Sequence, residues 1–165
     1  MIKNNYSPEW KKRGDRNGLI RNALLKSMGY TDKDIEKPII GIINTWAETN
    51  PGHYHFRQLA EAVKRGVWAA GGFPLEVNTM SICEVFFDLS SLIYRNLLAM
   101  TTEELIERHP FDGVVLIGGC DKNIPAQLMA AASADKPTIF LPGGAMLPGS
   151  FKGKKLVCGT DSFYI

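Results

Sequence analysis

The chain has 165 residues, of which 45% are hydrophobic and 22% are charged, a composition typical of one globular domain. Nineteen basic and seventeen acidic residues leave a formal charge of only +2, so neither nucleic acid nor a membrane surface is an expected partner. No run approaches the roughly 18 apolar residues of a membrane helix, and the start lacks the apolar segment of a secretion signal. We therefore expect a soluble, cytoplasmic protein.

Three cysteines are present, at positions 83, 120 and 158. They are odd in number and far apart, so a disulfide framework is not expected, and reduced thiols or a metal-linked role are better interpretations. Cys83 and Cys158 lie in no recognisable ligand spacing, and we expect them to be packing residues.

Residues 1–17 are polar and basic without apolar periodicity, which predicts a surface arm before a domain that spans 18–165. Within that domain, continuous apolar runs predict strands whose two faces are both covered, and apolar positions spaced by three and four predict helices. The predicted helices are 18–28, 55–70, 92–100, 101–109 and 125–132; the predicted strands are 39–43, 74–79, 113–117 and 138–141. This alternation predicts an α/β fold, a parallel sheet of about four strands with helices on both faces. The last 24 residues show no clear period.

Ligands in open parallel sheets collect beyond the carboxyl ends of the strands, where the strand-to-helix loops meet. The segments that follow the four predicted strands are 44–53, 80–84, 118–123 and 142–145, and they hold nearly all the polar functional residues of the sheet half. A candidate site is therefore expected at this rim.

The segment Gly118-Gly119-Cys120-Asp121-Lys122 is the most informative of these. Two glycines let the backbone approach a ligand, and the next three side chains offer a thiolate, a carboxylate and an amine. The alternative is a glycine-rich turn in which Cys120 is a small buried residue and Asp121 and Lys122 form a surface pair. Glu84 either caps the next helix or acts as a second oxygen ligand for Mg²⁺ beside Asp121. In the functional interpretation, residues 120–122 share a crevice with Glu84.

The other polar loop residues carry weaker signals. His53 and His55 are two residues apart and do not share a helix face, so a metal pair is less expected than hydrogen bonds on the substrate side. Gly143 and Gly144 could cradle an anion through backbone N–H groups.

Several collinear segments together resemble the N-terminal domain of the IlvD/Edd dehydratases, the family of dihydroxy-acid, phosphogluconate and aldonate dehydratases. The resemblance runs from about Gly18 to the end and rests on the segments Pro38–Trp46, Ala69–Glu76, Tyr94–Leu97, Asp112–Lys122, Gln127–Ser133 and Gly144–Gly149. The segments 81–84 and 94–97 are more similar to the sugar-acid members than to the branched-chain biosynthetic enzyme.

The resemblance implies an enzyme that dehydrates 2,3-dihydroxy acids, here aldonic sugar acids, to 2-keto-3-deoxy acids with an iron-sulfur cluster, 2Fe-2S or 4Fe-4S, and Mg²⁺. It implies that Cys120 is a cluster ligand and that Glu84 and Asp121 are Mg²⁺ ligands. Lys122 would be the catalytic lysine that several members carbamylate and use in the Mg²⁺ shell. A homo-oligomer is the expected state.

Two departures from the family pattern matter. Where the family has Pro-Cys-Asn or Pro-Cys-His, this sequence has Pro51-Gly52-His53, and glycine cannot ligate iron. The remaining ligands, the proposed serine base and a C-terminal domain belong to family sequence beyond the length present here. The expectation is thus an N-terminal part that is inactive alone. The alternatives are a diverged, non-catalytic domain that retains metal or carboxylate binding or a subunit contact, and a cluster in which His53 replaces the cysteine.

Overall fold

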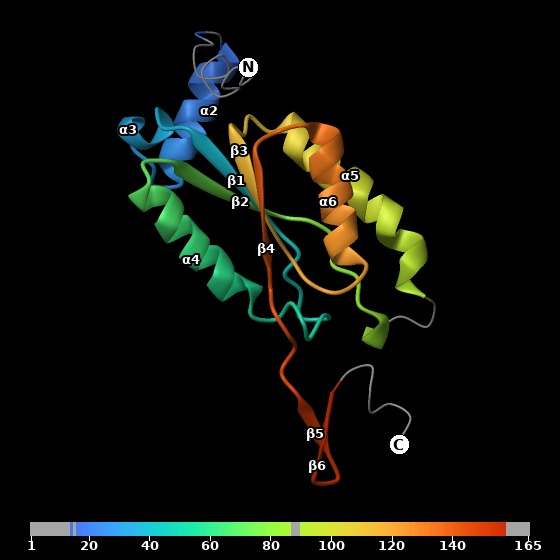
Figure 1. Cartoon of the computed structure of the whole chain (residues 1–165). Helices are drawn as coiled ribbons and strands as arrows, with labels where there is room; N and C mark the ends of the chain where they lie inside the picture. Colours follow the sequence, from blue (N-terminus) through green and yellow to red (C-terminus); the bar gives the residue numbers. More distant parts are fainter. Residues whose placement is uncertain (1–13, 15, 87–89, 158–165) are drawn as a thin grey trace.

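The computed structural model describes residues 14, 16–86 and 90–157, and its core is a four-stranded parallel sheet (Figure 1). The strands of this sheet are β1 (Ile39–Asn44), β2 (Phe73–Asn78), β3 (Gly113–Gly118) and β4 (Thr138–Pro142). The helices are α2 (Arg16–Ser27), α3 (Asp32–Ile35), α4 (Phe56–Ala69), α5 (Arg95–Arg108) and α6 (Asn123–Ala134), with 3-10 turns η1 (Glu84–Phe86) and η2 (Ser91–Tyr94).

The strand order β2-β1-β3-β4 places the first strand of the chain inside the sheet. All three neighbouring pairs are parallel, and in register Ile42 lies opposite both Glu76 and Val115. Helix α4 covers one face of the sheet, and α5 and α6 lie together on the other (Figure 1). The predicted α/β fold is confirmed.

Two apolar clusters explain why the central strands are apolar at every position. Ile39, Ile43 and Leu116 pack with residues of α5 and α6, whereas Ile42 and Ile117 pack against α4. Because successive side chains of a strand point to opposite faces, a strand between two helical layers buries both sets.

The prediction of two helices over 92–100 and 101–109 is wrong. A 3-10 turn, η2, leads into the single helix α5, which runs through both threonines. Thr101 donates its hydroxyl to the Leu98 carbonyl at 3.0 Å, and the Thr102 hydroxyl bonds that of Thr79 at 3.0 Å. Each hydroxyl finds a partner without interrupting the helix, so neither threonine acts as a cap.

The C-terminal segment also holds a short hairpin that its composition did not reveal. Strands β5 (Gly149–Phe151) and β6 (Lys154–Leu156) pair antiparallel. Lys152 and Gly153 connect them with positive φ angles of 49° and 77°, as in a type I′ turn. Three residues per strand are too few to produce a recognisable alternation.

The predicted N-terminal arm lies almost wholly outside the described residues, and α2 begins at Arg16, two residues before the expected helix start. Within the part of the chain that the structure describes, none of the helices has the length and hydropathy needed to cross a bilayer.

Candidate functional site

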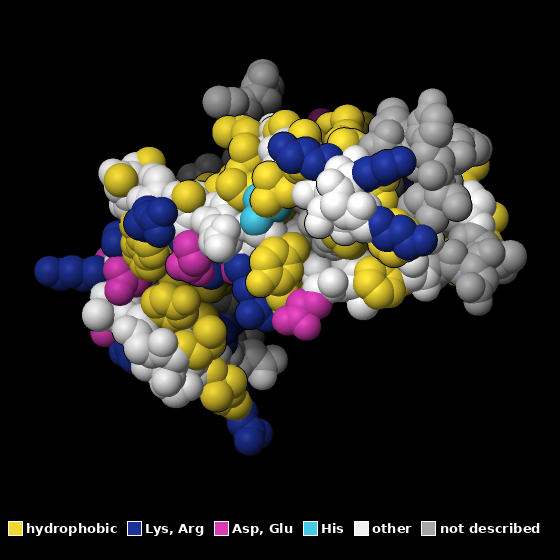
Figure 2. Space-filling view, turned by 90° about the horizontal axis from the view of Figure 1, so that it is seen from below, with side chains coloured by type: hydrophobic (Ala, Val, Ile, Leu, Met, Phe, Trp, Pro, Cys, Tyr) yellow, Lys and Arg dark blue, Asp and Glu magenta, His cyan; other side chains and the backbone are white. Residues whose placement is uncertain are grey.

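The four segments that follow the strands meet at one rim of the sheet. Backbone hydrogen bonds join them directly: Thr45 N donates to Ile117 O at 3.1 Å, and Gly143 N donates to Gly118 O at 2.9 Å. Figure 2 looks onto this end of the molecule and shows hydrophobic side chains at the surface with acidic and basic groups between them. The carboxyl rim, defined here as residues 44–55, 79–84, 118–123 and 143–145, is therefore a continuous surface.

Cys120 stands at a strained point of this rim. Its φ of +63° lies in the left-handed region that favours glycine, and Cys120 is exposed to solvent. The thiol approaches Asn50 Oδ1 at 4.0 Å, and a Cβ atom placed on Gly52 would lie 3.4 Å from the Cys120 sulfur. Gly52, the position at which the resemblance led us to expect a cysteine, is thus next to Cys120.

Lys122 brings Glu84 and Asp121 together. Its Nζ lies 2.9 Å from Glu84 Oε1 and 2.9 Å from Asp121 Oδ2, so the two carboxylate oxygens are at most 5.8 Å apart. Ser91 adds its backbone N–H and hydroxyl to the same Glu84 oxygen, at 3.3 and 3.1 Å. Glu84 and residues 121–122 therefore lie side by side at the carboxyl rim, and the crevice that they were expected to share with Cys120 stays a prediction.

The charges of this cluster shift one another's pKa values. Hydrogen bonds from Lys122 and then Ser91 lower the pKa of Glu84. Hydrogen bonds to Asp121 and then Glu84 raise the pKa of Lys122, so its amine is held as an ammonium. A carbamate forms only on a neutral amine, so these two carboxylates disfavour the carbamylation implied for Lys122.

The donor set suits Mg²⁺ in part. Mg²⁺ takes oxygen ligands at about 2.1 Å, keeps several waters and commonly uses only one or two protein carboxylates. Glu84 and Asp121 have side chains that are 50% and 78% exposed, which leaves room for such waters. Among the described residues, no group of three or more His, Cys, Asp or Glu side chains could hold a metal ion. Glu84 and Asp121 can therefore supply two oxygens, and the other ligands must come from elsewhere.

Two buried asparagines fix the loop that leads to Glu84, a role that no sequence motif indicates. Asn123 clamps the backbone of Ile82, accepting its N–H at 3.2 Å and donating to its carbonyl at 2.9 Å. Asn50 donates to Ser81 Oγ at 3.2 Å and to the Ile82 carbonyl at 3.4 Å. Both are fully buried, a property that a lone asparagine in a loop does not reveal.

The expectations for the histidines and the glycine pair need correction. His53 is fully buried, and its Nδ1 lies 2.8 Å from Thr45 O, so it is a structural group inside the rim and not a substrate-side donor. Burial lowers the pKa of His53. His55 Nε2 bonds the Gly143 carbonyl at 2.8 Å, while the Gly143 N–H is already used within the rim and offers nothing to an anion. Cys83 is partly buried, and Cys158 lies outside the described residues.

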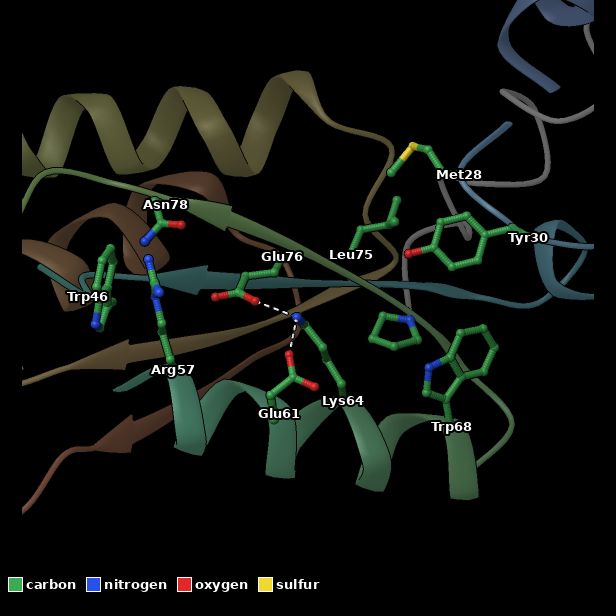
Figure 3. Close-up of a pocket in the computed structure, with 11 residues that line it drawn as sticks. Met28, Tyr30, Trp46, Arg57, Glu61, Lys64, Trp68, Leu75, Glu76 and Asn78 are labelled. Atoms are coloured by element: carbon green, nitrogen blue, oxygen red, sulfur yellow. Dashed lines mark hydrogen bonds and ion pairs between the residues drawn. The ribbon is translucent and has the colours of Figure 1, made fainter. Parts of the chain in front are cut away.

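A separate groove of about 560 Å³ lies along the β2 edge of the sheet, between that strand and α4 (Figure 3). Lys64 is ion-paired with Glu61 and Glu76 in its middle, and the Arg57 guanidinium stacks 3.6 Å from the Trp46 ring centre at one end. Glu84 and residues 120–122 do not line it. This groove and the residues predicted to bind a metal or a cluster are thus at different places.

Comparison with known proteins identifies the family of the chain. Residues 37–163, most of the chain, match the model of the dihydroxy-acid/6-phosphogluconate dehydratase N-terminal domain. The chain belongs to this dehydratase family. It is thus a member of a dehydratase, that is hydro-lyase, family, and the resemblance seen in the sequence is confirmed.

Relatives with known names agree with this assignment. The chain is 54% identical over 126 residues to a 6-deoxy-6-sulfo-D-gluconate dehydratase of Pseudomonas putida, covering 76% of this chain and 22% of that protein. It is 46% identical over 155 residues to an L-arabinonate dehydratase of Rhizobium leguminosarum bv. trifolii, covering 93% and 27%. A dihydroxy-acid dehydratase of Methanococcus vannielii is 47% identical over 148 residues, covering 85% and 27%. The chain spans about a quarter of the length of the relatives it matches.

Proposed function

We propose that this chain is the N-terminal part of a dehydratase that removes water from 2,3-dihydroxy acids to give 2-keto-3-deoxy acids. The observation that carries the proposal is the convergence of Glu84 and Asp121 on Lys122, beside Cys120, in a member of the dehydratase family. A non-glycine residue with a φ of +63° beside an ion-paired lysine is a costly arrangement for a purely structural loop.

In this proposal Cys120 would ligate an iron-sulfur cluster, and Glu84 and Asp121 would ligate Mg²⁺. When bound, these groups supply Lewis acidity for departure of the C3 hydroxide and for the charge on the substrate carboxylate. The residues of this chain would hold these groups in place and neutralise the charges of the site. The Lys122 ammonium compensates the two carboxylates while no divalent cation is present, and Asn50 and Asn123 keep the Glu84 loop beside the Cys120 turn.

Aldonic sugar acids are the proposed substrates. Support comes from the segments 81–84 and 94–97 and from the names of two relatives, which act on a sulfogluconate and on L-arabinonate. The dihydroxy-acid dehydratase, at 47% identity, is as similar as the L-arabinonate dehydratase at 46% and less similar than the sulfogluconate enzyme at 54%, so the preference rests mainly on the two segments.

The remaining part of the enzyme and a second subunit are the proposed partners, and the cytoplasm is the proposed location. An apolar groove lies between α5 and residues 78–80, and Leu97 and Met100 are exposed along it. An exposed apolar strip of this kind is typical of a surface that a partner covers.

The alternative function is a diverged domain without a cluster, which retains carboxylate or Mg²⁺ binding or a subunit contact. Gly52 favours it, because the side chain that would stand 3.4 Å from the Cys120 sulfur is missing. The intact cluster of Glu84, Asp121 and Lys122 favours the enzyme.

Iron and sulfide analysis separates the two functions. The full-length protein that carries these residues would be reconstituted anaerobically as wild type and as Cys120→Ser, with Cys83→Ser as the matched control. The enzyme proposal expects iron and sulfide in the wild type and in Cys83→Ser and a loss of both in Cys120→Ser. Wild-type protein without iron would support the diverged domain. A chain of 165 residues that dehydrates an aldonate by itself would overturn the proposed need for the remaining domain.

A further inference from the structure

Asn44, the last residue of β1, is fully buried at the start of the loop that follows this strand, residues 45–55, called here the β1 loop. Its side-chain Nδ2 donates to Glu76 Oε1 on β2 at 2.9 Å and, at 3.4 Å, to the carbonyl of Phe56, the first residue of α4. Its Oδ1 accepts the backbone N–H of Trp46 at 2.9 Å. One side-chain amide therefore joins β1 and β2 to the start of α4 and to the β1 loop.

The partners of Asn44 determine which way its amide points. A carboxylate can only accept a hydrogen bond, and a backbone N–H can only donate one. Glu76 therefore holds the NH₂ group of Asn44 on its own side, which leaves Oδ1 for the Trp46 N–H. Two partners of opposite kind thus fix one orientation of a group whose two ends are nearly the same in shape.

Glu76 is held in turn by the charged cluster in the groove between β2 and α4 (Figure 3). Its Oε2 pairs with Lys64 Nζ at 2.5 Å, and Lys64 also pairs with Glu61 at 2.7 Å. Glu76 thus uses one oxygen for the groove cluster and the other for Asn44. A continuous chain of polar contacts therefore runs from this groove to the carboxyl rim.

The β1 loop is the part of the rim that lies beside Cys120. Asn50 in this loop approaches the Cys120 thiol at 4.0 Å, and a Cβ atom on Gly52 would lie 3.4 Å from the same sulfur. Trp46 closes the loop, because its Nε1 donates to the carbonyl of Tyr54 at 3.1 Å. The position of Trp46 therefore constrains both ends of the segment that faces Cys120.

We propose that Asn44 is a positioning residue that holds the β1 loop beside Cys120, and that Glu76 orients its amide. The inference deepens the proposed function and rests on it only for the importance of Cys120. Loss of the Glu76 carboxylate should free the Asn44 amide to turn away from the Trp46 N–H. Loss of Lys64 should leave both hydrogen bonds of Asn44 in place, so the two losses separate positioning from an ion pair that only stabilises the fold.

The first test measures hydrogen exchange of the Trp46 amide by NMR, with the Leu116 amide in the central strand β3 as the reference for global opening. In the wild-type chain the Trp46 amide should be protected, and an amide that exchanges as fast as in an unfolded chain overturns the proposal. Glu76→Met should speed its exchange roughly tenfold relative to Leu116, the effect of about one lost hydrogen bond. Lys64→Met should leave the rate near that of the wild type. So should Glu76→Gln, because its side-chain oxygen still accepts from Asn44.

The second test reads how closely the β1 loop is held to Cys120. In Gly52→Cys, the equilibrium between the 52–120 disulfide and its two thiols is measured in glutathione buffers, and mass spectrometry identifies the disulfide. The effective concentration of the two thiols reports how well their positions are fixed. We expect added Glu76→Met to lower this effective concentration roughly tenfold, in line with the local opening of the loop. Added Lys64→Met or Glu76→Gln should leave it near the value of Gly52→Cys alone.

Both measurements are made where circular dichroism shows the variants folded, and Asn44→Ala replaces Glu76→Met if that variant does not fold. Equal effects of Glu76→Met and Lys64→Met would mean that the groove cluster is an ordinary ion pair, and they would overturn the proposal. An unchanged Trp46 amide or cross-link in Glu76→Met would overturn it as well. Neither readout involves iron, so full-length protein without iron would refute the proposed function and leave the positioning role of Asn44 intact.

Discussion

The two ends of the sheet are built from different kinds of polar contact. At the amino end, Asp112 accepts the Ile39 N–H at 2.8 Å, and Lys136 donates to the carbonyls of Ile106 and His109 at 2.7 and 3.1 Å. At the carboxyl rim, His53 Nε2 is buried without a partner of good geometry among the described residues, as is Gln127 Oε1 in the adjoining helix α6. These amino-end contacts pair their buried groups, whereas the carboxyl rim leaves the His53 nitrogen unsatisfied.

This difference suggests that the two ends of the sheet serve different purposes, the amino end stability and the carboxyl rim function. A buried polar group with its partners stabilises the fold, and one without them costs free energy that the rest of the protein must offset. We therefore expect substitutions at the amino end to change the free energy of unfolding, and substitutions of exposed rim residues to change chemistry more than stability.

The largest expected effect is a covalent link across the rim in Gly52→Cys. A Cβ atom at this position lies 3.4 Å from the Cys120 sulfur, so the new thiol should form a disulfide under oxidising conditions. Closing this long loop should raise the free energy of unfolding by about 3 kcal/mol, measured by urea denaturation of the oxidised and reduced forms. Gly52→Ser is the control. A variant that stays fully reduced in oxidant would show that positions 52 and 120 are not neighbours.

At the amino end, Lys136→Met should destabilise the protein. It leaves the carbonyls of Ile106 and His109, where α5 ends, without the ammonium that binds them, at a cost of about 2 kcal/mol. Thermal or urea unfolding measures the change, and Lys33→Met, at an exposed position of α3, is the matched control. Equal stability of the two variants would contradict the structural role given to this end of the sheet.

Lys122→Met tests the expectation that a substitution at the rim changes stability only slightly. The ion pairs of Lys122 with Glu84 and Asp121 involve carboxylates that are half exposed or more, so their loss should change the free energy of unfolding by only about 0.5 kcal/mol. Urea unfolding at low and high salt provides the measurement. A loss as large as that of Lys136→Met would remove the contrast between the two ends.

The smallest expected effect is a titration shift at Glu84. Lys122 and Ser91 hold the pKa of this carboxyl below its ordinary value of 4.5, so its pairing stabilises the fold above that pH and is lost as the pH falls through the lowered pKa. In Lys122→Met the pKa should rise toward 4.5. Carbon-detected NMR titration of the Glu84 carboxyl follows it. An unchanged midpoint would mean that Ser91 and not Lys122 controls this group.

The fold and part of the site were predictable because the signals are local. The apolar runs at Ile39–Ile43 and Gly113–Ile117 predicted buried parallel strands, and the position of Glu84 and Lys122 after strand ends predicted that they meet at one rim. The expectation that their two strands are neighbours is wrong, because β1 lies between β2 and β3. The predicted helix boundary at Thr101 was wrong because a threonine hydroxyl can either cap a helix or bond within it. Only the contact with the Leu98 carbonyl shows that this hydroxyl bonds within the helix. The roles of Glu84, Cys120, Asp121 and Lys122 as metal and cluster ligands stay predictions.

By itself, the sequence determined the alternation of strands and helices, the family and the set of reactive side chains at the strand ends, because hydrophobic periodicity and residue chemistry are properties of the chain. Only the tertiary structure decided that His53 faces inward, that Asn50 and Asn123 clamp the Glu84 loop, and that Gly52 lies against Cys120. These depend on contacts between loops far apart in the chain. The direction of a side chain in a loop is set by the neighbours that packing supplies, and no local pattern records them.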